Sequence, residues 1–511
     1  MEVAANGWEH ATIPFAALLE ALEFEQPATR TRAAQSLGFR GQKEAVEPLV
    51  RRLRTPEEDA TVRSAIYIAL GALGDKRAIP LLYGCLDREE RQELRGDCVM
   101  ALGRLGASEA LPRLLTALRE DSSILVRSRA VDALGDFSDD GAVAALSKLL
   151  TEGRNRSLRQ RAIRALGRTG SDKAAEPLLA ALESTDSDRE RSELADSLGR
   201  LGAAEAGEPL TKLLRDTEDA SLRVRIVVAL GAIRDGSAYP TLVALLEDDD
   251  AAVRYFALIA LRDLGEAAAA GPIKTLSLAI SERLQARTVA ELLDDPLTTL
   301  ADLSLQEVAL RALADLDAVE GLPAFLRAAP GRDLPRDSSL ALRIADAEYQ
   351  TRRLALYGLG YTDSRQAARL LTGASGLGDP DFRLRATAAR ALGILGFPET
   401  AERLADVIED ESAEVRWTAA LVLGRLGEAR AVAPLIARLS DPAAEVRKQA
   451  ALSLGYLNDP RARAMLVGMA EADGDSAVRE AAAYAADLLA EPPRARPAQG
   501  PPSSRRNGRR T

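Results

Sequence analysis

A short motif returns along this chain at intervals of 31 to 33 residues. Each copy contains a Leu-Gly or closely similar pair, and an arginine stands seven residues before its leucine. The leucines of the clear copies are Leu37, Leu70, Leu102, Leu134, Leu166, Leu198, Leu230, Leu392, Leu423 and Leu454. A repeat of this size cannot bury its own apolar residues, so neighbouring repeats must stack to form a continuous core.

Each repeat is predicted to contain two helices. In the repeat around Cys85, apolar residues at helical spacing indicate a first helix over about 79–86, with Pro80 in its first turn. The second helix is predicted to begin near Leu94 and to end at Leu102-Gly103, where the glycine terminates it. The chain is therefore expected to be all-α.

The repeat arginine is often preceded by an acidic residue six positions earlier. We expect an ion-pair ladder at the turn between the two helices, in which the acid also caps the second helix. The arginines that define this ladder are Arg63, Arg127, Arg254, Arg385, Arg416 and Arg447. The acids are Glu57, Glu89, Asp121, Asp248, Asp379, Asp410, Asp441 and Asp473.

The regular spacing fails in the middle of the chain. We expect an extension at 1–12, regular repeats 1–8 at 13–265, irregular units at 266–363, regular repeats 11–14 at 364–490, and a disordered tail at 491–511. The irregular part contains an added or lengthened helix near 273–293 and a loop over 328–342, and Gln306 and Tyr349 replace the repeat arginine. It is either a tolerated insertion or a hinge or docking element.

Composition agrees with a helical array and leaves little chemistry. The chain of 511 residues is 47% hydrophobic but only 4% aromatic, which suits closely packed helices. Two cysteines, Cys85 and Cys98, exclude a disulfide-rich scaffold, and we expect both to be buried free thiols. His10 is the single histidine, and no phosphate-binding or metal-binding motif occurs, so we expect no catalytic residue, cofactor or metal site.

Two segments quoted from the second half carry a family resemblance. Asp410–Gly427 reads DESAEVRWTAALVLGRLG, and Asp441–Leu457 has the same order of Asp, Val-Arg and Ala-Leu. These resemble HEAT repeats, and in particular the HEAT-like repeats of bacterial phycobilisome lyases. The resemblance covers about 13–490 and implies an α-α superhelix of about 14 two-helix units. In such arrays the second helices line the inner, concave face.

Positions one, two, five and nine after the repeat arginine should point away from the core, judged from the helical period. They supply candidate partner-binding residues of two kinds. The apolar and aromatic candidates are Val228, Tyr255, Phe256, Ile259, Trp417 and Leu421, and the basic ones are Arg161, Arg164, Arg168 and Arg225. Exposed apolar residues suggest binding anchors, although the inserted middle helix could instead cover Tyr255 and Phe256.

The predicted function is a non-catalytic scaffold or adaptor that binds one or more proteins along the inner face. The resemblance leaves an alternative, a lyase or chaperone-like factor that handles a bilin or other tetrapyrrole pigment. Nucleic-acid binding is a third hypothesis, but the net charge of −10 and the mixed inner ridge oppose it. No targeting or membrane-spanning segment is evident, so we expect a cytoplasmic protein. The tail from Pro492, with six arginines and no acid, is either solubilising or a contact for an acidic partner.

Overall fold

The computed structural model describes residues 13–55, 58–151, 155–329 and 339–490. Regular structure in these residues consists of α-helices and short 3-10 turns, without a strand, so the predicted all-α fold is confirmed. The chain forms two compact units, Met1–Thr241 and Leu242–Thr511, called unit 1 and unit 2 below. No helix of the described residues has both the length and the apolar character needed to cross a membrane.

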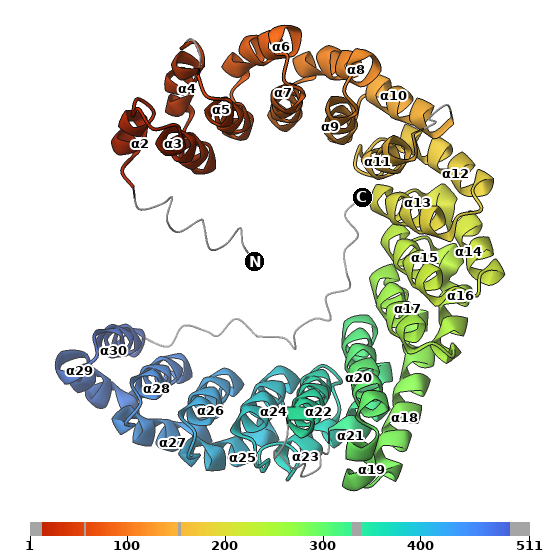
Figure 1. Ribbon diagram of the computed structural model, residues 1–511. Coiled ribbons are helices and arrows are strands. Elements are labelled where there is room, and N and C mark those ends of the chain that lie inside the picture. Colours follow the sequence, from red (N-terminus) through yellow and green to blue (C-terminus); the bar gives the residue numbers. More distant parts are fainter. Residues whose placement is uncertain (1–12, 56–57, 152–154, 330–338, 491–511) are drawn as a thin grey trace. The chain divides into compact units, whose positions relative to one another are not determined.

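Unit 1 contains two layers of helices (Figure 1). The first helices of its repeats form the outer layer: α4 (Val46–Leu53), α6 (Ile79–Arg88), α8 (Leu111–Glu120), α10 (Asp140–Thr151), α12 (Ala175–Ser184) and α14 (Gly207–Asp216). The second helices form the inner layer: α3 (Pro27–Arg40), α5 (Ala60–Leu73), α7 (Gln92–Leu105), α9 (Ile124–Leu134), α11 (Arg156–Leu166), α13 (Asp188–Leu201) and α15 (Ala220–Ile233). The short helix α2 (Phe15–Ala21) packs on α3.

Unit 2 repeats this arrangement with a different beginning. Its inner layer is α17 (Ala251–Leu264), α20 (Pro296–Leu316), α22 (Ser339–Leu359), α24 (Phe382–Leu395), α26 (Ala413–Leu426), α28 (Ala444–Leu457) and α30 (Ser476–Leu488), each packed on the next. Its outer helices are α18 (Ala270–Ala286), α21 (Ala318–Ala328), α23 (Arg365–Thr372), α25 (Ala401–Asp406), α27 (Val432–Ala437) and α29 (Arg463–Ala472). Helix α16 (Tyr239–Ala244) spans the division between the units, and α19 (Val289–Asp294) connects α18 with α20.

The glycine of the Leu-Gly motif in α5 has a different role from the predicted one. Gly71 lies inside α5, and a Cβ atom on it would stand 2.6 Å from the Cα atom of Ala101 in the next inner helix. The motif glycine of this repeat therefore permits close helix packing and does not end the helix, whereas α9 and α11 do end at the motif leucine, with Gly135 and Gly167 as their C-caps. Helix α5 ends three residues after Gly71 at Gly74, whose φ of 65° is the left-handed conformation that glycine adopts readily.

The repeat arginine connects consecutive repeats. Arg416 donates hydrogen bonds to the carbonyl oxygens of Asp410 and Glu411 in its own turn, at 2.9 and 3.0 Å. Its Nε and Nη2 atoms donate to the two carboxylate oxygens of Asp441 in the following repeat, at 2.8 and 2.9 Å. The side-chain partner is thus the acid of the next turn, whereas the arginine's own turn supplies backbone oxygens.

Ion pairs between a repeat arginine and an acid of the following repeat, called the ladder below, occur in both units. Its ion pairs are Arg30–Glu58, Arg63–Glu89, Arg95–Asp121, Arg159–Glu190, Arg352–Asp379, Arg385–Asp410, Arg416–Asp441 and Arg447–Asp473. Glu57, and the turn at 152–154 that follows Arg127, lie outside the described residues. Arg254 donates to the backbone oxygens of Asp248 and Asp249.

The predicted capping by the ladder acid is not what the structure shows. Asp410 accepts a hydrogen bond from the backbone N–H of Ser412, which precedes α26, and so shapes the turn before the helix. Where a side chain caps a second helix, it belongs to a later residue, as Asp250 does for α17 through the N–H groups of Ala252 and Val253.

The irregular region fills two repeats with longer helices. The segment expected as an added helix is α18, of 17 residues, followed by α19. Gln306 occupies the arginine position of α20 and is buried, donating to the hydroxyls of Ser277 and Ser281 at 2.9 and 3.0 Å. In α22 the ladder residue is Arg352, three positions after Tyr349, so the predicted register is shifted there. Residues 330–338 of the expected loop lie outside the described residues, and helix begins at Ser339.

Candidate functional site

A pocket of about 740 Å³ lies on the inner layer of unit 2. Four consecutive inner helices line it, namely α20, α22, α24 and α26. Its residues are Arg311, Ala314, Asp315, Arg353, Leu354, Tyr357, Thr387, Arg390, Ile394, Trp417, Leu421, Val422 and Arg425. This inner pocket combines apolar and aromatic surface with four guanidinium groups.

The aromatic part of the inner pocket comes from α22 and α26. Trp417 and Leu421, both predicted as outward-pointing residues, are half-buried there. Tyr357 is 44% exposed, and its hydroxyl lies 2.7 Å from that of Tyr361, which lies in the turn that follows α22. Partial burial and this hydrogen bond raise the pKa of Tyr361 to about 12, so its hydroxyl stays protonated at neutral pH and remains a hydrogen-bond donor.

The four arginines of the inner pocket differ in their partners. Arg390 contacts Glu414 at 3.2 Å, and Arg311 contacts Glu307 at 3.8 Å, both on exposed surface. Arg353 donates to the neutral side chain of Gln350 at 3.1 Å. Within the described parts of the chain, neither Arg353 nor Arg425 has a carboxylate partner. Exposed single pairs contribute little energy, so all four guanidinium groups are available to a ligand.

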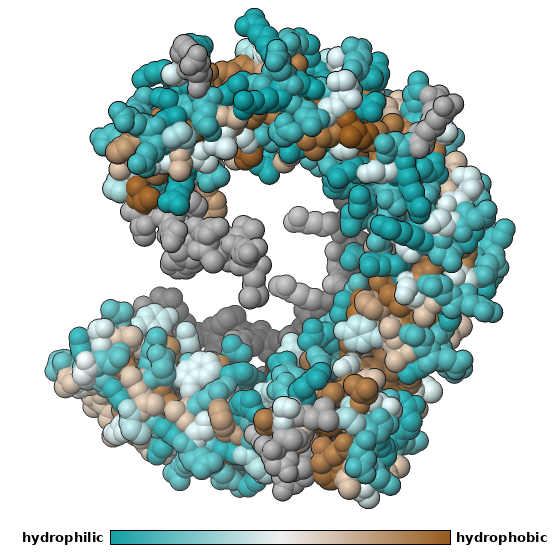
Figure 2. Space-filling model, in the orientation of Figure 1, coloured by the Kyte–Doolittle hydropathy of each residue, from teal (hydrophilic) through white to brown (hydrophobic). Residues whose placement is uncertain are grey.

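The basic candidates of unit 1 are arranged differently. Arg161 contacts Asp132 at 2.6 Å, Arg168 contacts Asp136 at 3.2 Å, and Arg225 contacts Asp196 at 3.4 Å. Asp132 and Asp196 lie on the preceding inner helices, and Asp136 lies in the turn that follows α9. Arg164 is exposed and has no ion pair with the described residues. Three of the four basic candidates in unit 1 are therefore paired with carboxylates, and Figure 2 shows mostly hydrophilic side chains over this unit.

The remaining apolar candidates are not part of the inner pocket. Val228, on α15 of unit 1, is 42% exposed. Tyr255, Phe256 and Ile259, on α17 of unit 2, are half-buried, and the two rings meet edge to face with centroids 5.3 Å apart. Helix α20 packs against α17, yet both rings keep part of their surface exposed. Their binding role stays a prediction.

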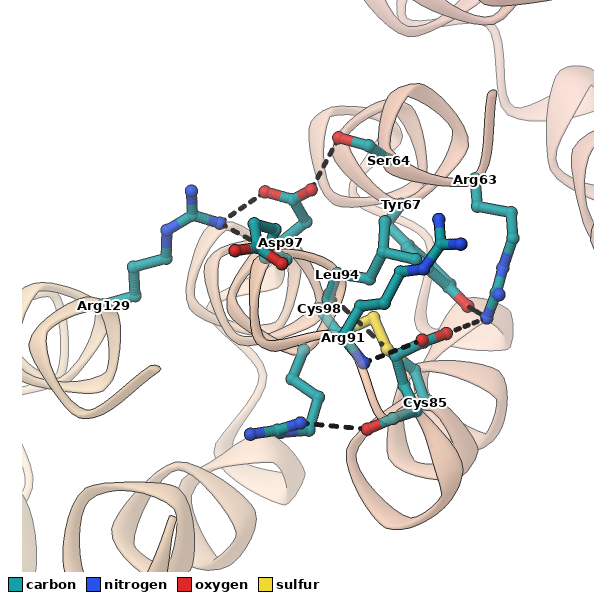
Figure 3. Close-up of a disulfide and its surroundings, with 12 residues drawn as sticks. Arg63, Ser64, Tyr67, Cys85, Arg91, Leu94, Asp97, Cys98 and Arg129 are labelled. Atoms are coloured by element: carbon teal, nitrogen blue, oxygen red, sulfur yellow. Dashed lines mark hydrogen bonds and ion pairs between the residues drawn. A yellow bond between two sulfur atoms is a disulfide. The ribbon is translucent and has the colours of Figure 1, made fainter. Parts of the chain in front are cut away.

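The cysteines correct an expectation. Cys85 on α6 and Cys98 on α7 form a disulfide, with Cα atoms 6.5 Å apart, instead of two free thiols (Figure 3). Both are buried, so the bond fastens an outer helix to its inner partner inside one repeat. Beside the disulfide, the buried Asp97 on α7 accepts hydrogen bonds from Ser64 on α5, at 2.5 Å, and from Arg129 on α9. These two hydrogen bonds connect three successive inner helices. Each cysteine considered separately in the sequence gives no sign of this bond. The bond depends on the two helices of the repeat, which face each other at these positions.

The described residues offer no assembled catalytic or metal centre. They contain no group of three or more His, Cys, Asp or Glu side chains arranged to hold a metal ion. His10 lies outside them. Because Cys85 and Cys98 are bonded to each other, neither sulfur is a nucleophile in this state.

Comparison with known families identifies the class of protein. The model for HEAT repeats matches residues 15–103, 85–157, 143–223, 207–293, 337–413 and 401–487. The chain therefore belongs to the HEAT-repeat family, as its sequence predicted. The search of curated proteins gives no match.

Several solved structures are similar to this chain. Kap95p, from the structure of its complex with RanGDP, is 14% identical over 93% of this chain and 76% of its own, with a TM-score of 0.52. Human deoxyhypusine hydroxylase is 26% identical over 52% of this chain and 98% of its own, with a TM-score of 0.23. The CpcE–CpcF phycocyanin lyase of Nostoc is 20% identical over 53% of this chain and 94% of its own, with a TM-score of 0.29. The likeness to Kap95p supports the helical solenoid fold.

Only Trp417 and Leu421 of the inner pocket were singled out from the sequence, although the rule of outward offsets also gives other residues that line it. Arg390 and Arg425 stand five and nine positions after Arg385 and Arg416, which are the outward-pointing offsets. Counted from Arg352, the same offsets of one and five give Arg353 and Tyr357. Counting from Tyr349 hides these two residues.

Proposed function

We propose that this chain is a scaffold that binds partner proteins through the inner layer of unit 2. The observation that supports this most is the inner pocket, which joins four helices and offers a half-buried Trp417 beside the exposed ring of Tyr357. Exposed aromatic side chains next to arginines are typical anchors of protein interfaces. An array of stacked helices holds such anchors rigidly, so binding need not order a flexible surface.

The proposal is tested by crosslinked affinity purification from the native host, with mass spectrometry and a visible absorbance spectrum of the eluate. A Tyr357→Ala, Trp417→Ala variant is compared with the wild type. The matched control is Met465→Ala, Val467→Ala, which removes apolar side chains 53% and 40% exposed on the outer helix α29. Circular dichroism verifies that each variant is folded.

We expect a stoichiometric protein partner that the pocket variant loses and the control retains. Identical partners in all three samples would contradict a role of the pocket. A visible pigment in the eluate without a protein partner would contradict the scaffold and favour the tetrapyrrole alternative.

The cytoplasmic compartment is a second part of the proposal, and the disulfide bears on it. Disulfides are rare in the reducing cytosol. Alkylation of thiols in intact cells, followed by mass spectrometry of the peptides that contain Cys85 and Cys98, tests the compartment. Alkylated cysteines support the cytoplasm, and a disulfide-linked peptide pair supports an oxidising compartment.

A further inference from the structure

We infer that the inner pocket of unit 2 binds an extended acidic segment of a partner protein. In this arrangement carboxylates of the segment contact Arg353 and Arg425, and an apolar side chain between them contacts Trp417. The inference rests on the proposed function and adds the chemistry of the partner.

Charge supports an acidic ligand. Four arginines and a single carboxylate, that of Asp315, line the pocket, whereas the whole chain has a net charge of −10. Two of the arginines lack a carboxylate partner in the described part of the chain, so binding them does not require breaking an existing ion pair. A guanidinium group matches a carboxylate through two parallel hydrogen bonds.

The spacing of charges favours a peptide over a nucleic acid. Three carboxylates lie among the arginines. Glu307 is 3.8 Å from Arg311, Glu414 is 3.2 Å from Arg390, and Asp315 lines the pocket itself. A phosphate backbone carries a charge at every nucleotide and would meet these carboxylates. A peptide can present separate carboxylates with neutral residues between them. The chain's own tail from Pro492 has six arginines and no acid, so its charge opposes binding here.

The dimensions set the length of the segment. Adjacent packed helices are about 8–10 Å apart, so four of them span roughly 24–30 Å. An extended peptide advances about 3.3 Å per residue, and about eight residues therefore cross the pocket. Successive side chains of an extended peptide point in opposite directions, so alternating acidic and apolar residues place like side chains on one side.

The experiment uses the full chain and two synthetic peptides. One peptide alternates glutamate with leucine over about eight residues, and its twin has glutamine at every glutamate. The chain has two tryptophans, Trp8 and Trp417, so a Trp8→Phe background makes Trp417 the single fluorescent reporter. Titration of each peptide gives a dissociation constant from a signal located in the pocket. A labelled single-stranded oligonucleotide serves as the competing class of ligand.

Two sets of charge variants locate the contact. Arg353→Gln, Arg425→Gln should weaken glutamate-peptide binding about tenfold, and Asp315→Asn should strengthen it about twofold. The matched control Arg403→Gln, Arg430→Gln removes the same charge from exposed outer positions of unit 2, where each arginine pairs with a nearby acid. It should change binding less than twofold, or about 0.4 kcal/mol. Circular dichroism confirms folding, and the opposite sign expected for Asp315→Asn separates a charge effect from damage to the fold.

The inference is overturned if the glutamate and glutamine peptides bind alike, if the arginine pair has no more effect than its control, or if the oligonucleotide binds more tightly than the peptide. Failure of the inference is distinguishable from failure of the scaffold. A native partner lost on Tyr357→Ala, Trp417→Ala, combined with no preference for the glutamate peptide, would retain the scaffold and reject the acidic ligand.

Discussion

The inner layers of the two units use arginine for different purposes. In unit 1, Arg161, Arg168 and Arg225 each contact an acid of the preceding repeat. In unit 2, Arg353 and Arg425 face the inner pocket without a carboxylate partner in the described chain. Nine positions after the repeat arginine, for example, Arg168 of unit 1 contacts a carboxylate, whereas Arg425 of unit 2 has no carboxylate partner in the described chain. Whether an exposed arginine serves cohesion or recognition depends on its neighbour from the adjacent repeat.

The units also differ in how their repeats are held together. In unit 2 four successive ladder pairs run without interruption from Arg352 to Asp473. The ladder of unit 1 is more varied, and a buried disulfide fastens one of its repeats. The stability of a repeat array depends on each repeat and on each interface between neighbours. Local changes should therefore affect the two units separately.

The largest expected effect is that of Arg416→Met in unit 2. Substitution should lower the free energy of unfolding by about 3 kcal/mol, because the Asp441 carboxylate, whose side chain has no exposed surface, loses its main partner. Arg438, at 3.6 Å, limits the loss. Urea denaturation followed by circular dichroism measures it. Arg159→Met, at the more exposed pair with Glu190 in unit 1, should cost less, and equal losses would contradict the difference between the ladders.

Removal of the disulfide should destabilise unit 1 to a similar or slightly smaller extent. The bond closes a loop with a sequence separation of 13 residues, for which loop entropy predicts about 3 kcal/mol or less. Denaturation of the wild type with and without dithiothreitol measures the effect. A Cys85→Ala, Cys98→Ala variant should unfold like the reduced wild type and should not respond to the reductant. If the reductant shifted only the part of the unfolding transition that Arg416→Met also shifts, the disulfide would not act on unit 1, and this prediction would be contradicted.

Acid should weaken the ladder. Burial by itself would raise the pKa of Asp441, but hydrogen bonds from Arg416 and from the N–H of Ala443 outweigh it, so the pKa lies below its usual value. A lowered carboxyl pKa contributes stability above the unfolded pKa of about 3.9, and this contribution is lost as the pH falls through the folded pKa. The urea concentration at which half of the protein is unfolded should therefore decrease when the pH is lowered below about 4. Arg416→Met should make that decline shallower, and an unchanged slope would refute the coupling.

The smallest expected effect is a gain of acidic-peptide binding by unit 1 when the carboxylate partners of its arginines are removed. Asp132→Asn, Asp136→Asn removes the carboxylates that contact Arg161 and Arg168. In the Arg353→Gln, Arg425→Gln background, this change should restore weak binding of the glutamate peptide, by about twofold for each freed arginine. Fluorescence anisotropy of a labelled peptide measures it. No gain in a folded variant would mean that available charge without an adjacent Trp417 is insufficient.

Much of this architecture could be predicted from the residue pattern. The helices around Cys85 were expected at 79–86 and from Leu94, and they occur as α6, Ile79–Arg88, and α7, Gln92–Leu105. Trp417 and Leu421 were expected to point away from the core, and they line the inner pocket. These predictions succeed because burial of one helix face fixes the helical period, which in turn fixes the direction of every other side chain.

Other features required contacts between repeats. The ladder partner of Arg416 is Asp441 of the next repeat, because the arginine extends toward the following turn. Arg352 substitutes for Tyr349 because α22 follows a lengthened repeat, and the longer helices shift its register. The cysteine pairing depends on how α6 faces α7. None of these can be read from spacing along a single helix.

The sequence by itself determined the helical repeat, its family and the outward offsets after the repeat arginine in the regular repeats, since all of these depend on local periodicity. Only the tertiary structure decided which outward residues meet. Four helices bring Arg311, Arg353, Arg390 and Arg425, which lie 35 to 42 residues apart in the chain, to one pocket. In unit 1, the stacking of helices places Arg161 beside Asp132. The physical reason is that side-chain direction is set within a helix, whereas the neighbour that neutralises a charge is set by the stacking of one helix on the next.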